Sequence, residues 1–187
     1  ARDPYFRTTF EPYPAAPGMP EVVRNMCEAS RKAGVGPMAA VAGAISQQAV
    51  RAMVEAGSKH CLVDNGGDIA MRTNRTITVG LYAGERTPNY LAIEVPATKG
   101  LLGICTSSGT VGPSISLGRA DLATVISEDV ALADACQPQP PDVDGPLHRH
   151  LVHAGSLPLA GQRAQPADPH GVQDHDGQLG LGAPGRA

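Results

Sequence analysis

Two stretches of the sequence combine residue types that could carry chemistry. The first, Asp64-Asn65-Gly66-Gly67-Asp68, places two carboxylates on either side of a flexible backbone. The second, residues 103–121 (GICTSSGTVGPSISLGRAD), crowds Thr and Ser hydroxyls into a Gly-rich loop that follows an apolar run. Hydroxyls and free backbone N–H groups in such a loop can hold an anion or a phosphate group. The first stretch, taken alone, is more typical of an ordinary hairpin turn than of a binding site.

Several known types of site do not fit these residues. The Gly-rich loop has neither the Gly-Lys-Ser/Thr of a P-loop nor the G-x-G-x-x-G of a dinucleotide-binding turn. A Ser or Cys hydrolase is poorly supported, because His60 is the only histidine before residue 137 and no G-x-S-x-G elbow is present. The cysteines lie far apart with no C-x-x-C pair, which argues against zinc-ribbon and thioredoxin-type sites.

Composition limits the expected partners and compartment. The formal net charge of −3 supplies no basic stripe for a phosphate backbone, so no nucleic acid is expected. No apolar run is long enough to cross a bilayer, so no membrane association is expected either. Isolated cysteines in apolar stretches are typical of a reducing compartment, which favours the cytoplasm. Because the chain begins at Ala1 rather than Met, we expect an N-terminal segment to be missing.

Two helices are predicted before residue 57. Residues 20–32 place Val23, Met26, Cys27 and Ser30 on one helical face. Residues 37–56 have a stronger helical period, with an apolar face predicted to be buried and a polar face predicted to point outward. The predicted buried face holds Met38, Val41, Ala42, Ile45, Ala49, Met53 and Ala56, and the outward face holds Gln47, Gln48, Arg51 and Glu55. Small residues at the start of this helix allow a backbone or a ligand to come close, and tight packing on a sheet is the favoured interpretation.

A run of strands is predicted from residue 60 onward. Residues 60–64 and 69–73 flank Asn65-Gly66, a dipeptide typical of hairpin turns. Residues 76–82 and 91–95 alternate between apolar and polar positions, whereas 100–106 and 122–127 are short apolar runs suited to buried strands. Two helices followed by hairpin-joined strands predict an α+β fold, an antiparallel sheet with helices packed on one face.

The composition changes abruptly at Gln137. Residues 137–187 contain no Ile, Phe, Tyr, Met or Lys and are rich in Gly, Pro and His. The few large apolar residues of this tail cannot offset the entropy lost on ordering the chain, and the tail is therefore predicted to be disordered. The organised domain is predicted to span residues 1–136. A metal-binding function for the scattered histidines is a weaker alternative. Because several of the missing residue types have A/T-rich codons, as expected when a GC-rich gene is read in the wrong frame, we also hypothesise that the tail is a frameshift product.

Four motifs, in this order and spacing, resemble the UPF0280 (DUF375) family. They are GPMAAVAGAI, VDNGGDIAM, GICTSSGTVGPSISLGRAD and ADAC. That family is similar to the ApbE proteins, which are FAD-dependent protein flavinyltransferases. The resemblance covers residues 1 to about 136 and implies an ApbE-like, T-fold-related architecture that is truncated here at both ends.

The resemblance implies a flavin and Mg²⁺ site. The residues that would line FAD or FMN, or another nucleotide phosphate, are Gly66, Gly67, Asp68, Thr106, Ser107, Ser108, Gly109 and Ser114. Asp134 would be a metal carboxylate, and the threonine that ApbE enzymes carry four residues later is Pro138 here. We therefore expect Asp68, Thr106, Ser107 and Asp134 to converge on one cleft. The implied partners are a small-molecule flavin or nucleotide and a second copy in a homodimer.

Two functions remain open because the sequence departs from the ApbE pattern. ApbE enzymes normally carry a Lys before a Gly in the segment matching residues 38–48, with an Asp a few residues on. The matching positions here are about Gly43 and Gln48. One hypothesis is metal-assisted flavinyl transfer, in which Mg²⁺ neutralises a pyrophosphate while a hydroxyl or water attacks. The other is a ligand-binding or assembly module that kept the fold and lost the chemistry.

Overall fold

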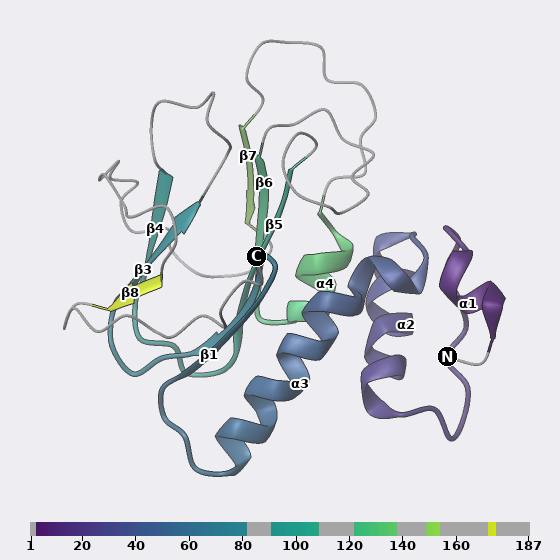
Figure 1. Cartoon of the computed structure of the whole chain (residues 1–187), viewed down its shortest axis with the longest axis horizontal. Helices are drawn as coiled ribbons and strands as arrows, with labels where there is room; N and C mark the ends of the chain where they lie inside the picture. Colours follow the sequence, from purple (N-terminus) through teal and green to yellow (C-terminus); the bar gives the residue numbers. More distant parts are fainter. Residues whose placement is uncertain (1–2, 82–90, 109–121, 138–148, 154–171, 175–187) are drawn as a thin grey trace, which may run out of the picture.

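Four α-helices of the described chain gather on one side of the molecule (Figure 1). The computed structural model describes residues 3–81, 91–108, 122–137, 149–153 and 172–174. The helices are α1 (Pro4–Thr8), α2 (Glu21–Ala33), α3 (Val41–Glu55) and α4 (Val130–Ala135), with a 3-10 turn, η1 (Pro37–Ala40), before α3. Helices α3 and α4 lie side by side, and α2 contacts both. None of the helices in the described ranges has the length and apolar character needed to cross a bilayer.

The described strands form two sheets. The strands are β1 (Cys61–Asn65), β2 (Asp68–Arg72), β3 (Ile77–Leu81), β4 (Leu91–Val95), β5 (Leu102–Ser107), β6 (Leu122–Ser127), β7 (Arg149–His153) and β8 (Val172–Asp174). One sheet has the order β1-β2-β5-β6-β7 and the other the order β4-β3-β8. All pairs are antiparallel except β6 with β7, which are parallel.

The two faces of the five-stranded sheet are covered differently. Ala70 belongs to a buried cluster with Val50 of α3 and Val130 of α4. Its neighbour Ile69 belongs to another cluster, which includes Val79 of β3. Because successive residues of a strand point to opposite faces, the helices cover one face and the three-stranded sheet covers the other. The predicted α+β class, with helices on one face of an antiparallel sheet, is confirmed, and the second sheet is an addition to it.

Helix α2 forms where its sequence predicts it. The helix begins after Pro20 and ends at Gly34, whose φ of 75° lies in the left-handed region. Met26, Cys27 and Ser30 are buried on the predicted face. The amphipathic pattern therefore determines both the extent and the orientation of this helix.

Helix α3 forms where predicted, but the predicted buried face is wrong. Ile45 is 49% exposed and Met53 is 40% exposed, whereas Gln47 is only 3% exposed. The face that packs inward carries Gly43, Ala44, Ser46, Gln47 and Val50. Small side chains let α3 approach α4 and β2 closely, and close packing outweighs the burial of larger but more distant apolar side chains.

The β1–β2 hairpin is shifted by one residue from the sequence prediction. Asn65 pairs with Asp68, so the two turn residues are Gly66 and Gly67 rather than Asn65 and Gly66. Both glycines have positive φ, 70° and 100°. Gly-Gly and Asn-Gly both suit a tight two-residue turn with positive φ at both positions, so local turn preference does not distinguish the two registers. This shift makes Asp68 the first residue of β2.

Two short strands come from the tail for which disorder was predicted. Strand β7 extends the large sheet beside β6, and β8 pairs with β3. Apart from Gln137, the remaining residues of the tail lie outside the described ranges.

Candidate functional site

Two buried carboxylates lie at the interface between the helices and the large sheet. Asp68 begins β2, directly after the glycine turn, and is 9% exposed. Asp134 lies in the last turn of α4 and is 8% exposed. Helix α4 packs across β5 and β2, and this packing brings the two carboxyl groups into one electrostatic environment. Neither has a Lys or Arg ion-pair partner among the described residues.

Burial raises the pKa of both carboxyl groups. The pKa of Asp134 is raised to about 8, first by desolvation and then by the negative charge of Asp68. The pKa of Asp68 is raised to about 6, chiefly by desolvation and further by the charge of Asp64. Near neutral pH the pair therefore resists full ionisation and retains a proton. A cation bound between the two carboxylates would relieve the same repulsion.

Helix α3 holds Asp134 through its backbone. The N–H of Gly43 donates a hydrogen bond of 2.7 Å to the Asp134 carboxylate. A Cβ at position 43 would lie 2.6 Å from the Asp134 Cβ and 2.6 Å from the carbonyl oxygen of Val130. Only glycine fits this contact without a shift of α4. The small residue that brings the helices together also supplies the donor that orients Asp134.

Asp68 has polar neighbours from three other segments of the chain. The Gln137 side-chain amide donates to its carboxylate, and the Ser46 hydroxyl of α3 donates to its backbone carbonyl at 3.1 Å. The Cys105 thiol of β5 lies close enough to the Asp68 carboxylate to lower the Asp68 pKa against the effect of burial, while its Sγ donates to the backbone carbonyl of Val130 at 3.6 Å. Burial raises the pKa of Cys105 itself, so this thiol stays protonated and acts as a donor.

The glycine turn and the Thr/Ser-rich segment lie next to each other. The carbonyl oxygen of Gly67 accepts a hydrogen bond of 3.1 Å from the N–H of Thr106. The Thr106 hydroxyl, however, bonds the Thr124 hydroxyl at 3.0 Å. Alternation along β5 puts Thr106 on the sheet face opposite Cys105 and Asp68. The backbone of Thr106 therefore reaches the turn, while its side chain lies on the far face of the sheet.

The remaining residues predicted for the site have different positions. Ser107 lies by alternation on the same sheet face as Cys105 and is half-buried, as is Ser108 just after β5. Gly66 is exposed at the tip of the hairpin and Gly67 is half-buried. Gly109 and Ser114 lie outside the described residues. The structure thus brings Asp68, Asp134 and the backbone of the Thr106 segment together and leaves the rest of the loop undescribed.

Asp64 has a local function in the hairpin. Its carboxylate accepts a hydrogen bond of 2.9 Å from the N–H of Gly67 and is exposed. This is the pattern of an Asp that stabilises its own turn. Of the two carboxylates that flank the glycines, only Asp68 is buried beside Asp134.

Three residues around the carboxylates were not predicted from sequence. They are Gly43 and Gln137, which donate hydrogen bonds to Asp134 and Asp68 respectively, and Cys105, whose thiol lies beside Asp68. The run of small residues at 39–44 was a usable signal for close approach to Gly43. No local pattern marks Cys105 or Gln137, and Gln137 had been assigned to the tail.

The described residues offer two carboxylates, and no more, to a metal ion at this place. No three side chains of His, Cys, Asp or Glu come together closely enough to hold a metal ion within the ranges that the structure describes. Mg²⁺ is commonly held by one or two carboxylates together with water and the phosphates of a substrate. The donor set of Asp68 and Asp134 fits that mode of binding and does not fit an all-protein cage.

Comparison with known proteins places the first 137 residues in a family. The family model described as "AbpE bacteria" matches residues 1–137. A UPF0280 protein of Methanocella arvoryzae is 59% identical over 135 residues, which are 72% of this chain and 55% of the relative. A UPF0280 protein of Methanosarcina barkeri is 54% identical over 133 residues, 71% of this chain and 53% of the relative. A UPF0280 protein of Archaeoglobus fulgidus is 48% identical over 133 residues, which are 71% of this chain and 54% of the relative. The chain thus spans about half the length of the curated relatives it matches.

Proposed function

Because this chain belongs to the UPF0280 family, we propose that its first 136 residues form an ApbE-like domain that binds a flavin or nucleotide phosphate together with Mg²⁺. The observation that carries the proposal is the buried pair Asp68 and Asp134. Burying two carboxylates without a cationic partner costs stability. Such a pair is expected where its charge serves a function.

The residues present fit a magnesium ion. Both carboxylates supply hard oxygen ligands, and hydrogen bonds from the Gly43 N–H and the Gln137 amide hold them in place. Mg²⁺ bound there would neutralise the phosphates of the ligand and stabilise charge that develops on them. The raised pKa values of Asp68 and Asp134 mean that binding a cation would release protons near neutral pH.

The glycine turn supports a place for the phosphates. Gly67 has no side chain to block the approach of a ligand, and its carbonyl is tied to the N–H of Thr106. Ser107, on the sheet face of Asp68, offers a hydroxyl at the same end of β5. These groups would bind and orient an oxyanion beside the carboxylates. No residue is assigned to the attack itself.

Gly43 favours the second candidate function, a ligand-binding module without transfer activity. By the resemblance given above, position 43 matches a Lys of ApbE enzymes. The contacts around Gly43 leave no room for a side chain without a shift of α4. A chain that cannot place a cation at this position would keep the Mg²⁺ carboxylates and lose a group that acts on the phosphates.

Binding of FAD with and without Mg²⁺ tests the proposal. We expect Mg²⁺ to raise the affinity for FAD by about tenfold, or about 1.4 kcal/mol. Asp134→Asn should abolish this gain, because an amide cannot supply the negative charge that holds the ion. Isothermal titration of FAD into each protein, at millimolar Mg²⁺ and with a chelator, measures the difference.

Asp64→Asn is the matched control. Asp64 is the exposed carboxylate of the same hairpin, and Asn keeps an oxygen that can accept the hydrogen bond from Gly67. This variant should retain the full effect of Mg²⁺. Equal FAD binding in all conditions by the unmodified chain and by Asp134→Asn would contradict the proposal. Mass spectrometry of any flavinylated protein product separates transfer from binding alone.

A further inference from the structure

A polar pocket lies at the N-terminal end of α4, whereas Asp134 of the carboxylate pair lies near the C-terminal end of that helix. It has a volume of about 310 Å³ and is formed by α2, α3 and the turn between β6 and α4. This volume is at the small end of the range for ligand-binding pockets. All its lining side chains are polar or charged: Asn25, Glu28, Gln47, Arg51, Glu128 and Asp129.

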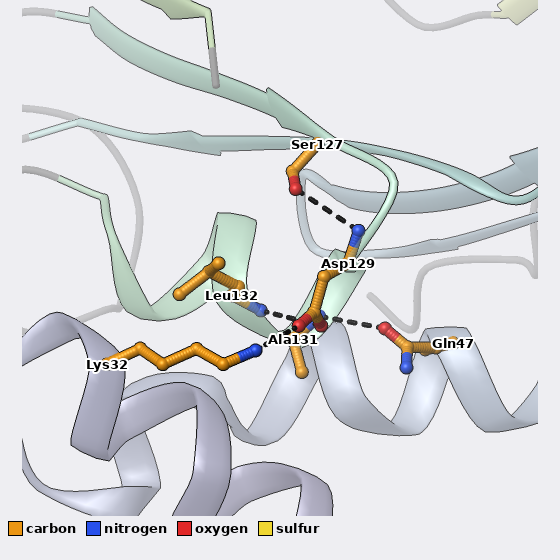
Figure 2. Close-up of polar contacts among 6 residues, drawn as sticks. All are labelled: Lys32, Gln47, Ser127, Asp129, Ala131 and Leu132. Atoms are coloured by element: carbon orange, nitrogen blue, oxygen red, sulfur yellow. Dashed lines mark hydrogen bonds and ion pairs between the residues drawn. The ribbon is translucent and has the colours of Figure 1, made fainter. Parts of the chain in front are cut away.

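Two of the charged groups in the lining already have partners. Asp129 caps α4 by accepting from the N–H of Leu132, and its other oxygen pairs with Lys32 at 3.3 Å (Figure 2). Arg51 pairs with Glu21 at 3.0 Å. Each of these two ion pairs is neutral as a whole. The net charge of the pocket is therefore set by the carboxylates that have no ion-pair partner.

Glu28 and Glu128 supply that charge. Neither carboxylate has an ion-pair partner among the described residues, and both side chains are exposed. They belong to different elements, α2 and the β6–α4 turn, yet line the same pocket. A ligand that bridges them must carry positive charge.

Two amide donors point to an acceptor on the same ligand. The Gln47 oxygen accepts a hydrogen bond of 3.1 Å from the N–H of Ala131. This bond fixes the orientation of the amide, and Figure 2 shows the Nε2 directed away from Ala131. Gln47 is 3% exposed as a residue, and no hydrogen bond of its Nε2 is found within the described residues. The Nδ2 of Asn25 is itself buried and has no hydrogen-bond partner in the described part of the chain. A buried donor such as this Nδ2 is normally satisfied.

A single metal ion does not match this arrangement. In the described part of the chain, no three acidic or metal-ligating side chains converge on one point. The carboxylates of Glu28, Glu128 and Asp129 therefore do not form a metal site. The inner donors are N–H groups, which repel a cation. The pocket is also separate from the carboxylate pair, because Asp129 precedes α4 and Asp134 lies five residues later, about 7.5 Å along the helix axis.

We propose that this pocket binds a small primary amine that also carries an oxygen acceptor, such as an ω-amino acid. The ammonium group lies between Glu28 and Glu128, and a carboxylate or carbonyl oxygen accepts from the Gln47 Nε2 and the Asn25 Nδ2. This site is independent of the flavin and Mg²⁺ proposal. Its failure or success therefore leaves that proposal unchanged.

Three probes of similar length distinguish recognition of the ammonium group by the carboxylates from recognition of the oxygen acceptor by the amide donors. They are 4-aminobutanoate, butylamine and butanoate, tested by saturation-transfer NMR and by titration with the whole chain. We expect 4-aminobutanoate to bind best, because butylamine has no acceptor for the amide donors and butanoate is repelled by the carboxylates. Equal signals from all three probes, or no saturation transfer to 4-aminobutanoate, would overturn the proposal.

Two variants locate the binding. Glu28→Gln combined with Glu128→Gln should weaken 4-aminobutanoate by roughly fivefold, since each exposed ion pair is worth up to about 1 kcal/mol. Gln47→Glu keeps an oxygen for Ala131 but replaces the Nε2 donor by an acceptor, so it should lower binding further. Because a buried carboxylate also costs stability, the binding is measured well below the melting temperature of this variant. Glu55→Gln removes an exposed carboxylate elsewhere on α3 and should change nothing. Binding that is unaffected by the first two changes refutes the site.

Discussion

The two faces of helix α3 contrast sharply. The inward face carries Gly43, Ser46 and Gln47, which are small or polar, and every one of them is buried. The outward face carries Ile45 and Met53, which are large and apolar, and both are exposed to 40% or more. A helix placed by hydrophobicity alone would have the opposite orientation.

The difference shows that α3 is oriented by close contact and by hydrogen bonds. Gly43 allows the backbones of α3 and α4 to approach and donates to Asp134. Gln47 accepts from Ala131, one of the N–H groups at the start of α4 that have no partner within that helix. Both contacts require the inward orientation, and the exposed side chains of the other face lose little by comparison because isolated apolar residues on a surface are common.

The largest expected effect comes from filling the inward face. Gly43→Val should destabilise the protein by about 3 kcal/mol, because the added atoms overlap the Val130 carbonyl and Asp134. Ala52→Val on the exposed face of α3 is the control and should cost about 0.5 kcal/mol through helix propensity alone. Chemical unfolding of both variants measures the free energies. Similar costs at the two positions would mean that the contact between α3 and α4 is loose.

A pH-dependent effect is expected at the other partner of that contact. Asp134 has a folded-state pKa of about 8 against an ordinary value of 3.8, so the folded state holds a proton that the unfolded state has lost. The contribution of Asp134 to the free energy of unfolding is therefore greatest below about pH 4, and it is lost as the pH rises toward about 8. Asp134→Asn removes this loss and should stabilise the protein at pH 8 by about 1 to 2 kcal/mol, with little effect at pH 4.

Melting curves of Asp134→Asn and the parent across this pH range provide the measurement. A parallel pH dependence of the two proteins would show that Asp134 ionises normally in the folded state. Any gain in stability is expected to accompany loss of Mg²⁺-dependent FAD binding, as is common when a buried functional charge is removed.

The smallest effect is expected on the outward face. Ile45→Thr should change the free energy of unfolding by no more than about 0.5 kcal/mol, because the side chain is already 49% exposed. The same measurement as for Gly43→Val applies. A cost well above this value would show that something covers Ile45 in solution, and sedimentation of the parent and the variant would then test for association.

Much of the fold could be predicted from local patterns. The amphipathic period of α2 correctly predicted which of its side chains are buried. The alternation in β3 and the apolar run of β5 correctly predicted the positions of these two strands. The orientation of α3 could not be predicted, because it depends on which partner comes close. Partners 84 and 91 residues away in sequence, Ala131 for Gln47 and Asp134 for Gly43, decide it.

The candidate site was predictable to a smaller extent. The resemblance selected Asp68 and Asp134, which do lie in one environment. Thr106 was selected with them, yet its side chain points to the other sheet face and bonds Thr124. Strand alternation would have separated Thr106 from Asp68 if the register of β2 with β5 had been known. The register follows from long-range pairing, and the sequence carries no local signal for it.

Helix α4 has only six residues, from Val130 to Ala135. Helices this short do not persist in water on their own, because nucleation costs more than so few hydrogen bonds return. The helix therefore exists only while it is docked on α3, and Asp134 faces Asp68 only in that docked state. Any ligand that joins the two carboxylates acts as a tether on α4 and draws the folding equilibrium toward the native protein. Assembly of the site and cooperative folding of this half of the domain are thus one thermodynamic event.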